Sequence, residues 1–171
     1  MSASRIGAAF AALLAGTSIA AGACPQSLAA YEQTGSRLSL AFDGATADTD
    51  AVMHRFHVVA SDTGARMDGV VMMVDDPVRP WGMVMYRCPE GDVTGAEIDA
   101  CTVWEGEMLA VDADGAESFI PVPDTGYAAP VIAAPSLRLP GFAAALVKSS
   151  VWDKTASIEP TDLFELKGCQ E

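Results

Sequence analysis

Four cysteines are the feature that most restricts how this chain of 171 residues can fold. Cys88 and Cys101 flank a 12-residue insert, whereas Cys24 and Cys169 lie far apart, the second of them close to the end of the sequence. An even number of cysteines is typical of a disulfide framework in an exported protein. Three pairings are possible, and we predict Cys88 with Cys101 and Cys24 with Cys169. A redox or metal role is the alternative, but it usually shows as a close pair such as C-x-x-C, which the sequence lacks.

The first 23 residues indicate export. Arg5 is followed by an apolar run from Ile6 to Leu14 and then by small residues that end at Ala23. This order is typical of a secretory signal peptide, which is removed from the mature protein. The apolar run is shorter than the ~20 residues that a membrane-spanning helix needs. We therefore expect residues 24–171 to form one domain that is periplasmic or secreted and does not span a membrane.

Lipidation of Cys24 is an alternative to its disulfide, because a lipoprotein cysteine directly follows the cleavage site. Ala21 stands three residues before this cysteine, where lipoprotein signals usually carry a large aliphatic residue. Lipidation would also leave an odd number of cysteines in an oxidising compartment. The disulfide is favoured, and the sequence leaves lipidation open.

The charge of the chain argues against nucleic acid as a partner. There are 23 acidic residues against 10 basic ones, which gives a formal net charge of -13. Loss of Arg5 with the signal peptide leaves nine basic residues, so the mature chain carries -14. The basic residues are scattered singly and form no stripe that could follow a phosphate backbone. With 50% hydrophobic residues, the chain has ample material for a folded core.

Hydrophobic periodicity predicts an α+β or mainly β domain with an antiparallel meander sheet of about six strands. Strand-like segments cover residues 37–42, 52–60, 66–74, 81–87, 102–112, 117–122 and 162–167. Asp62-Thr63-Gly64 and Asp114-Gly115 are expected hairpin turns. The segment DDPVRP is expected to break the sheet, because Pro77 and Pro80 cannot donate to a ladder.

Two or three short helices accompany this sheet. Thr94 and Glu97 form a capping-box pattern that predicts a helix ending near Cys101. Pro140 is expected in the first turn of a second helix over 141–149. Residues 121–135 are rich in proline, alanine and glycine and are expected to form a long surface loop.

His54 and His57 are the only histidines and stand three residues apart. On the predicted strand their odd spacing places them on opposite faces, which argues against a shared metal site. They remain the main candidates for a general base. Glu105 and Glu107 lie two residues apart and would share one strand face at ~6.5–7 Å, a glycosidase-like spacing. A hydrolase using His57 or this pair is therefore an alternative, although no nucleophile motif accompanies it.

Methionines offer a second alternative, a periplasmic copper-binding protein. Met83 and Met85 share one face of a predicted strand, and Met73 is expected to lie across from them. Met67 and Met72 fall on the same neighbouring strand, and Met53 stands beside His54. Thioethers are soft ligands that select Cu(I). Methionine is also an ordinary core residue, and packing in the core is favoured for this set.

A stiff, charged segment is the candidate partner-binding loop. It contains Asp75, Asp76, Arg79 and Trp81, and tryptophan and arginine are enriched at binding hot spots. The competing interpretation places Trp81 in the core and pairs Arg79 with Asp75 or Asp76.

The sequence thus favours a disulfide-stapled, exported protein that binds or modulates an envelope partner. Its acidity would attract a basic protein, for example a lysozyme-like enzyme. No catalytic residue, cofactor or metal ligand is predicted. A small-ligand carrier with the sheet curled into a cup is a further alternative.

Overall fold

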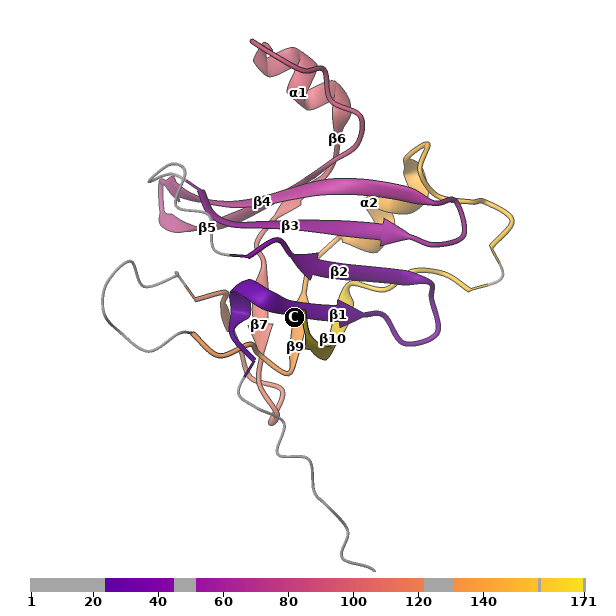
Figure 1. Ribbon diagram of the computed structural model, residues 1–171. Coiled ribbons are helices and arrows are strands. Elements are labelled where there is room, and N and C mark those ends of the chain that lie inside the picture. Colours follow the sequence, from indigo (N-terminus) through magenta and orange to yellow (C-terminus); the bar gives the residue numbers. More distant parts are fainter. Residues whose placement is uncertain (1–23, 45–51, 122–130, 157, 171) are drawn as a thin grey trace, which may run out of the picture.

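The computed structural model describes residues 24–44, 52–121, 131–156 and 158–170 (Figure 1). The expected signal peptide, residues 1–23, lies outside this range. The described residues form one antiparallel sheet of ten strands, in the order β6-β5-β4-β3-β2-β1-β10-β9-β7-β8. The strands are β1 (Ala29–Glu32), β2 (Leu38–Phe42), β3 (Val52–Ala60), β4 (Ala65–Asp75), β5 (Val78–Met85), β6 (Thr102–Gly106), β7 (Leu109–Val111), β8 (Glu117–Phe119), β9 (Ser136–Arg138) and β10 (Leu163–Cys169). The helices are a 3-10 turn η1 (Gln26–Leu28), α1 (Gly95–Cys101) and α2 (Phe142–Lys148).

The sheet curves into a half-barrel. Two residues, Glu107 and Met108, separate β6 at one end of the strand order from β7 near the other end. So short a connection requires the two ends of the sheet to lie close together in space. The predicted single strand over 102–112 is therefore two strands, which pair with different neighbours, β5 and β9.

The mainly β, single-sheet architecture agrees with the sequence, but about six strands was too few. From β1 to β6 the order is the expected meander, whereas β10, β9, β7 and β8 continue the sheet in a different order. β1 and β9 were missed because they are only 4 and 3 residues long. Segments of that length show no readable alternation, and long-range partners define them instead.

The prediction that DDPVRP breaks the sheet is wrong. Asp76 and Pro77 form a two-residue turn, and Pro80 lies within β5 opposite Met73. The last β5–β6 pair is Gly82 with Gly106, so β5 has no partner on that side at Pro80. An edge of this kind is where a sheet accommodates proline.

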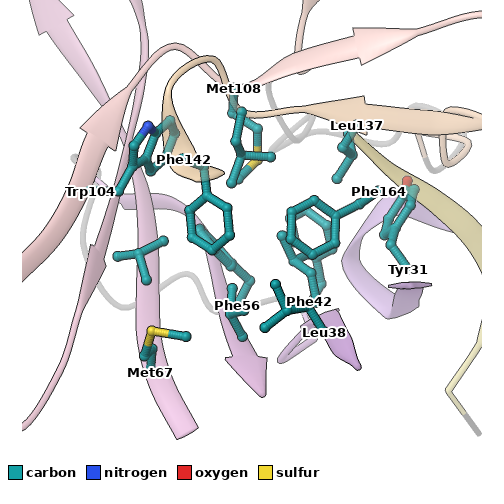
Figure 2. Packing of buried hydrophobic residues seen from close by; sticks show 14 of the residues in the cluster. Tyr31, Leu38, Phe42, Phe56, Met67, Trp104, Met108, Leu137, Phe142 and Phe164 are labelled. Atoms are coloured by element: carbon teal, nitrogen blue, oxygen red, sulfur yellow. The ribbon is translucent and has the colours of Figure 1, made fainter. Parts of the chain in front are cut away.

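The concave side of the half-barrel is filled by large side chains from most of the strands and from α2 (Figure 2). Phe142 packs edge-on against Trp104 and Phe164, with ring centroids 6.1 and 5.6 Å apart. The Trp104 indole donates a hydrogen bond to the Pro140 carbonyl (2.9 Å), which satisfies its polar atom in the core. The interior is therefore an aromatic core, consistent with the hydrophobic content of the chain.

Aromatic rings in this core lie directly over glycines. Phe56 covers Gly69, its partner on β4. Trp104 covers both Gly82 and Gly106, where an added Cβ would approach the indole to 3.0 and 2.9 Å. These glycines provide the space that the inward-facing rings occupy.

Both predicted disulfides are present. Cys24 bonds to Cys169 across the ends of the domain, and Cys88 bonds to Cys101. Two disulfides are typical of proteins outside the reducing cytosol. The Cys24 thiol is consumed by its disulfide, so lipidation there would require this bond to be absent.

The two predicted helices form with different boundaries and caps. α1 carries the predicted capping box, with Thr94 and Glu97 each bonded to the other's backbone N–H. α2 begins at Phe142, so Pro140 lies before the helix rather than in its first turn. The cap of α2 comes from a distant residue, because Asp162 accepts hydrogen bonds from the backbone N–H groups of Gly141 and Ala143 (both 2.8 Å).

Candidate interaction surface

The convex side of β4 and β5 carries a row of apolar side chains. Gly69 and Val71 on β4 point inward and are buried, as are Gly82 and Val84 on β5. The residues that alternate with these four along the strands therefore point outward. Five of them are apolar, half-buried and adjacent, and we call them the β4–β5 face: Val70, Met72, Trp81, Met83 and Met85.

The strand register brings these five residues into one patch. Met72 pairs directly with Trp81, and Val70 pairs with Met83. Charged residues of both signs adjoin the patch: Asp68 stands opposite Met85 and Glu105 opposite Met83, whereas Arg55 on β3 stands opposite Val70. Both carboxylates are exposed, so the apolar centre has a charged rim.

Arg79 and Glu107 border the patch beside Trp81. The Arg79 guanidinium lies over the Trp81 ring, 4.9 Å from its centroid. Its Nε atom is 3.4 Å from a Glu107 carboxylate oxygen, an ion pair whose geometry does not make a hydrogen bond. A cation held over the indole face is attracted by the ring quadrupole. Arg79 therefore holds Trp81 against the outer surface of the sheet.

Three of the four residues of the predicted partner-binding loop lie in strands, and only Asp76 lies in a turn. Asp75 ends β4, Asp76 is in the turn, and Arg79 and Trp81 are outward residues of β5. The competing interpretation is wrong on both counts, because Trp81 is not among the core residues and Arg79 pairs with Glu107 instead of an aspartate. Val70 also belongs to this surface and was not predicted, whereas Met72 was predicted only as one of the candidate copper-binding methionines. A two-residue turn at Asp76-Pro77 would have fixed the register that reveals them.

The Cys88–Cys101 insert is an arm at one end of this surface. It begins three residues after Met85, and Figure 1 shows α1 standing away from the rest of the molecule. None of its residues is buried. Four of them are acidic and none is basic: Glu90, Asp92, Glu97 and Asp99. A disulfide and a capping box thus hold in shape a segment that adds nothing to the core.

The two histidines lie on opposite faces of β3, as their spacing predicts. His54 is 4% exposed, and its Nε2–H donates to the Pro121 carbonyl (3.0 Å). Burial lowers the pKa of His54 below its usual value, with the Pro121 hydrogen bond opposing the shift. His57 faces outward, where its Nδ1 lies 2.6 Å from an Asp43 oxygen that is also 3.5 Å from Arg66. The two imidazoles therefore cannot act on one substrate or metal.

The methionines divide between the two sides of the sheet. Met67 is fully buried, Met53 is nearly so, and Met73 packs against the core. The expectation that Met73 lies across from Met83 and Met85 is therefore wrong, because Met73 occupies the inward alternation of β4. Met72 takes the outward position instead. Within the described ranges, no cluster of three or more histidine, cysteine or acidic residues forms a metal site.

Glu105 ends up on β6 opposite Met83, and Glu107 follows the end of that strand and binds Arg79. The pair therefore borders the β4–β5 face.

A separate open groove of about 550 Å³ runs between the base of the arm and α2. It is lined by Tyr86, Ala100, Cys101, Thr102, Val103, Gly141, Ala144, Ala145, Lys148, Ser149, Ser150 and Val151.

No protein-family model, curated protein or solved structure matches the chain. None of the helices in the described parts of the chain has the length and apolar character needed to cross a bilayer.

Proposed function

We propose that this protein is a periplasmic, non-catalytic binding protein that modulates a basic protein of the cell envelope. The β4–β5 face is its docking surface, with the acidic arm beside it. The observation that carries the proposal is the outward position of Trp81, which is held by Arg79 among three methionines and a valine. Aromatic residues, methionine and arginine are the residue types enriched in interfaces, where they form an apolar centre inside a polar rim.

Charge selects the class of partner. The rim of the face carries Asp68, Asp75, Asp76 and Glu105 against Arg55 and Arg79, and the arm adds four further carboxylates and no basic residue. The chain as a whole has a net charge of -13. Complementary charge speeds the encounter of two proteins and disfavours partners of like charge. A basic protein fits this surface, and its binding should weaken as ionic strength rises.

Site-specific crosslinking in the cells that produce the protein tests this proposal. A photoreactive amino acid replaces Trp81 in one variant and Ile158 in a control. Ile158 is 52% exposed and lies by Gly35 in the β1–β2 connection, at the opposite end of the strands from Trp81. We expect one dominant adduct at position 81, none at position 158, and a captured protein with a basic isoelectric point. An acidic or neutral protein at position 81 would overturn the proposal, as would no adduct there.

The purified complex provides the quantitative test. Trp81→Ala should weaken the affinity for the captured protein by about tenfold or more, as expected for a hot-spot tryptophan. Ile158→Ala should leave the affinity within about twofold, because an exposed residue outside the interface contributes little. Neutralising the rim with Asp75→Asn and Asp76→Asn should slow association and flatten its salt dependence. Equal affinities for Trp81→Ala and the wild type would show that the partner docks elsewhere.

A further inference from the structure

Three thioethers lie together on the convex side of the sheet. Met83 and Met85 are successive outward residues of β5, ~6.5–7 Å apart along the strand. Met72 pairs with Trp81, so it is a diagonal neighbour of Met83 at ~7–8 Å. Long side chains reach each other over such separations. Met83 is thus the central member, with one methionine within reach on either side.

Neither packing nor strand propensity accounts for this placement. The core already contains Met67 and Met108, both of which are fully buried. Half-exposed strand positions favour β-branched and aromatic residues, and methionine is neither. Methionine suits a docking face, and its polarisable sulfur is in addition a ligand for soft metal ions.

These sulfurs are also the soft ligands that the protein leaves available. All four cysteines are in disulfides, so no thiol competes for a soft metal ion. Thioether sulfur selects Cu(I) over the harder divalent ions. The residues that directly face the methionines include two carboxylates, Asp68 opposite Met85 and Glu105 opposite Met83. Two cations also border the face, Arg55 opposite Val70 and Arg79 over Trp81. Because the carboxylates are the groups that directly face Met83 and Met85, their negative charge favours a monovalent cation bound there.

We propose that Met83 binds Cu(I) on the convex surface, together with Met85 on one side or Met72 on the other. The site involves no redox step, because the ion binds and leaves in the same oxidation state. This proposal does not rest on the docking function, since a metal site and a protein interface can fail independently.

The test is a competition titration of the purified, disulfide-intact chain with Cu(I) and a coloured Cu(I) chelator under anaerobic conditions. Met83→Leu keeps the apolar volume but removes the shared sulfur, so we expect at least about a tenfold loss of Cu(I) affinity, equivalent to about 1.4 kcal/mol. Met72→Leu and Met85→Leu each remove one of two alternative partners and should cost less. Met67→Leu is the matched control in the core and should leave the affinity unchanged. The proposal is overturned if the wild type does not compete with the chelator, or if Met83→Leu and Met67→Leu bind equally.

Ag(I) gives a second readout that excludes copper oxidation chemistry. It is a soft monovalent ion, and its binding beside Trp81 should change the tryptophan fluorescence of the wild type but not of Met83→Leu. Trp81→Ala separates the two proposals, because it removes the docking anchor and keeps all three sulfurs. Its Cu(I) affinity should remain that of the wild type even where its affinity for the captured protein is lost. An unchanged fluorescence in the wild type would contradict the metal site whatever the crosslinking shows.

Discussion

Gly69→Ala should destabilise the protein, because Phe56 occupies the space above this glycine. The two residues are partners on β3 and β4, and both face the core. A Cβ at position 69 would lie 2.6 Å from the Cδ2 atom of the Phe56 ring, with two other ring atoms closer still. Carbon atoms in good contact are about 3.5–4.0 Å apart, so the ring would have to move by roughly 1 Å.

The surroundings of Phe56 allow little movement. The ring is 1% exposed, and Phe42 lies on a neighbouring strand with its centroid 5.9 Å away. Overpacking a closed core costs about 1–3 kcal/mol, and we expect the upper half of that range here. For a domain of this size, such a loss lowers the melting temperature by roughly 5–10 °C.

Urea and thermal unfolding of Gly69→Ala and Gly168→Ala measure this effect against a matched control. Gly168 is also a strand glycine, but no atom lies within 4 Å of an added Cβ. Its substitution should be neutral or stabilise the protein by about 0.4–1 kcal/mol through the unfolded state. Phe56→Leu in the Gly69→Ala background should recover part of the loss, which gives a non-additive double-mutant cycle. Equal stabilities of the two alanine variants would refute the packing argument.

Two further predictions concern a buried histidine and the arm. Burial lowers the pKa of His54. As the pH falls through about 6.5, this side chain takes up a proton in the unfolded chain but stays neutral in the folded one. Stability is then fully present above that pH and decreases below it, and His54→Gln should show a flatter urea midpoint between about pH 7.5 and about pH 5. Removal of the Cys88–Cys101 disulfide by double serine substitution should cost roughly 3 kcal/mol in the chain-entropy model. Hydrogen exchange should show loss of protection in α1 and not in β3, because a seven-residue helix with no buried residue does not hold alone. Unchanged protection in α1 would contradict this.

Elements with local signals could be predicted from the sequence. The capping box of Thr94 and Glu97 marks the start of α1, because both hydrogen bonds join residues three apart. Asp62-Thr63-Gly64 lies between β3 and β4, and Gly64 has the positive φ of 67° that such a turn favours. The disulfide pairing also followed from chain spacing. Each of these features depends on a few neighbouring residues or on the number of cysteines.

Features that depend on distant partners could not be predicted. β9 is three residues long and exists because it lies between β10 and β7. The break between β6 and β7 arises where the chain passes from one end of the strand order towards the other. Asp162 caps α2 from 19 residues away. No local pattern reports a strand neighbour or a cap at that distance.

The outward position of Trp81 shows why the candidate surface was ambiguous in sequence. β5 alternates large apolar residues, Trp81 and Met83, with the small Gly82 and Val84. Burial of the larger set would normally be favoured, and a shift of one residue in register exchanges the two faces. The structure buries the smaller set because Trp104 from β6 already fills the interior above Gly82, where an added Cβ would meet its ring at 3.0 Å. Trp104 in the core therefore places Trp81 on the surface, and the docking and copper proposals both depend on that exchange.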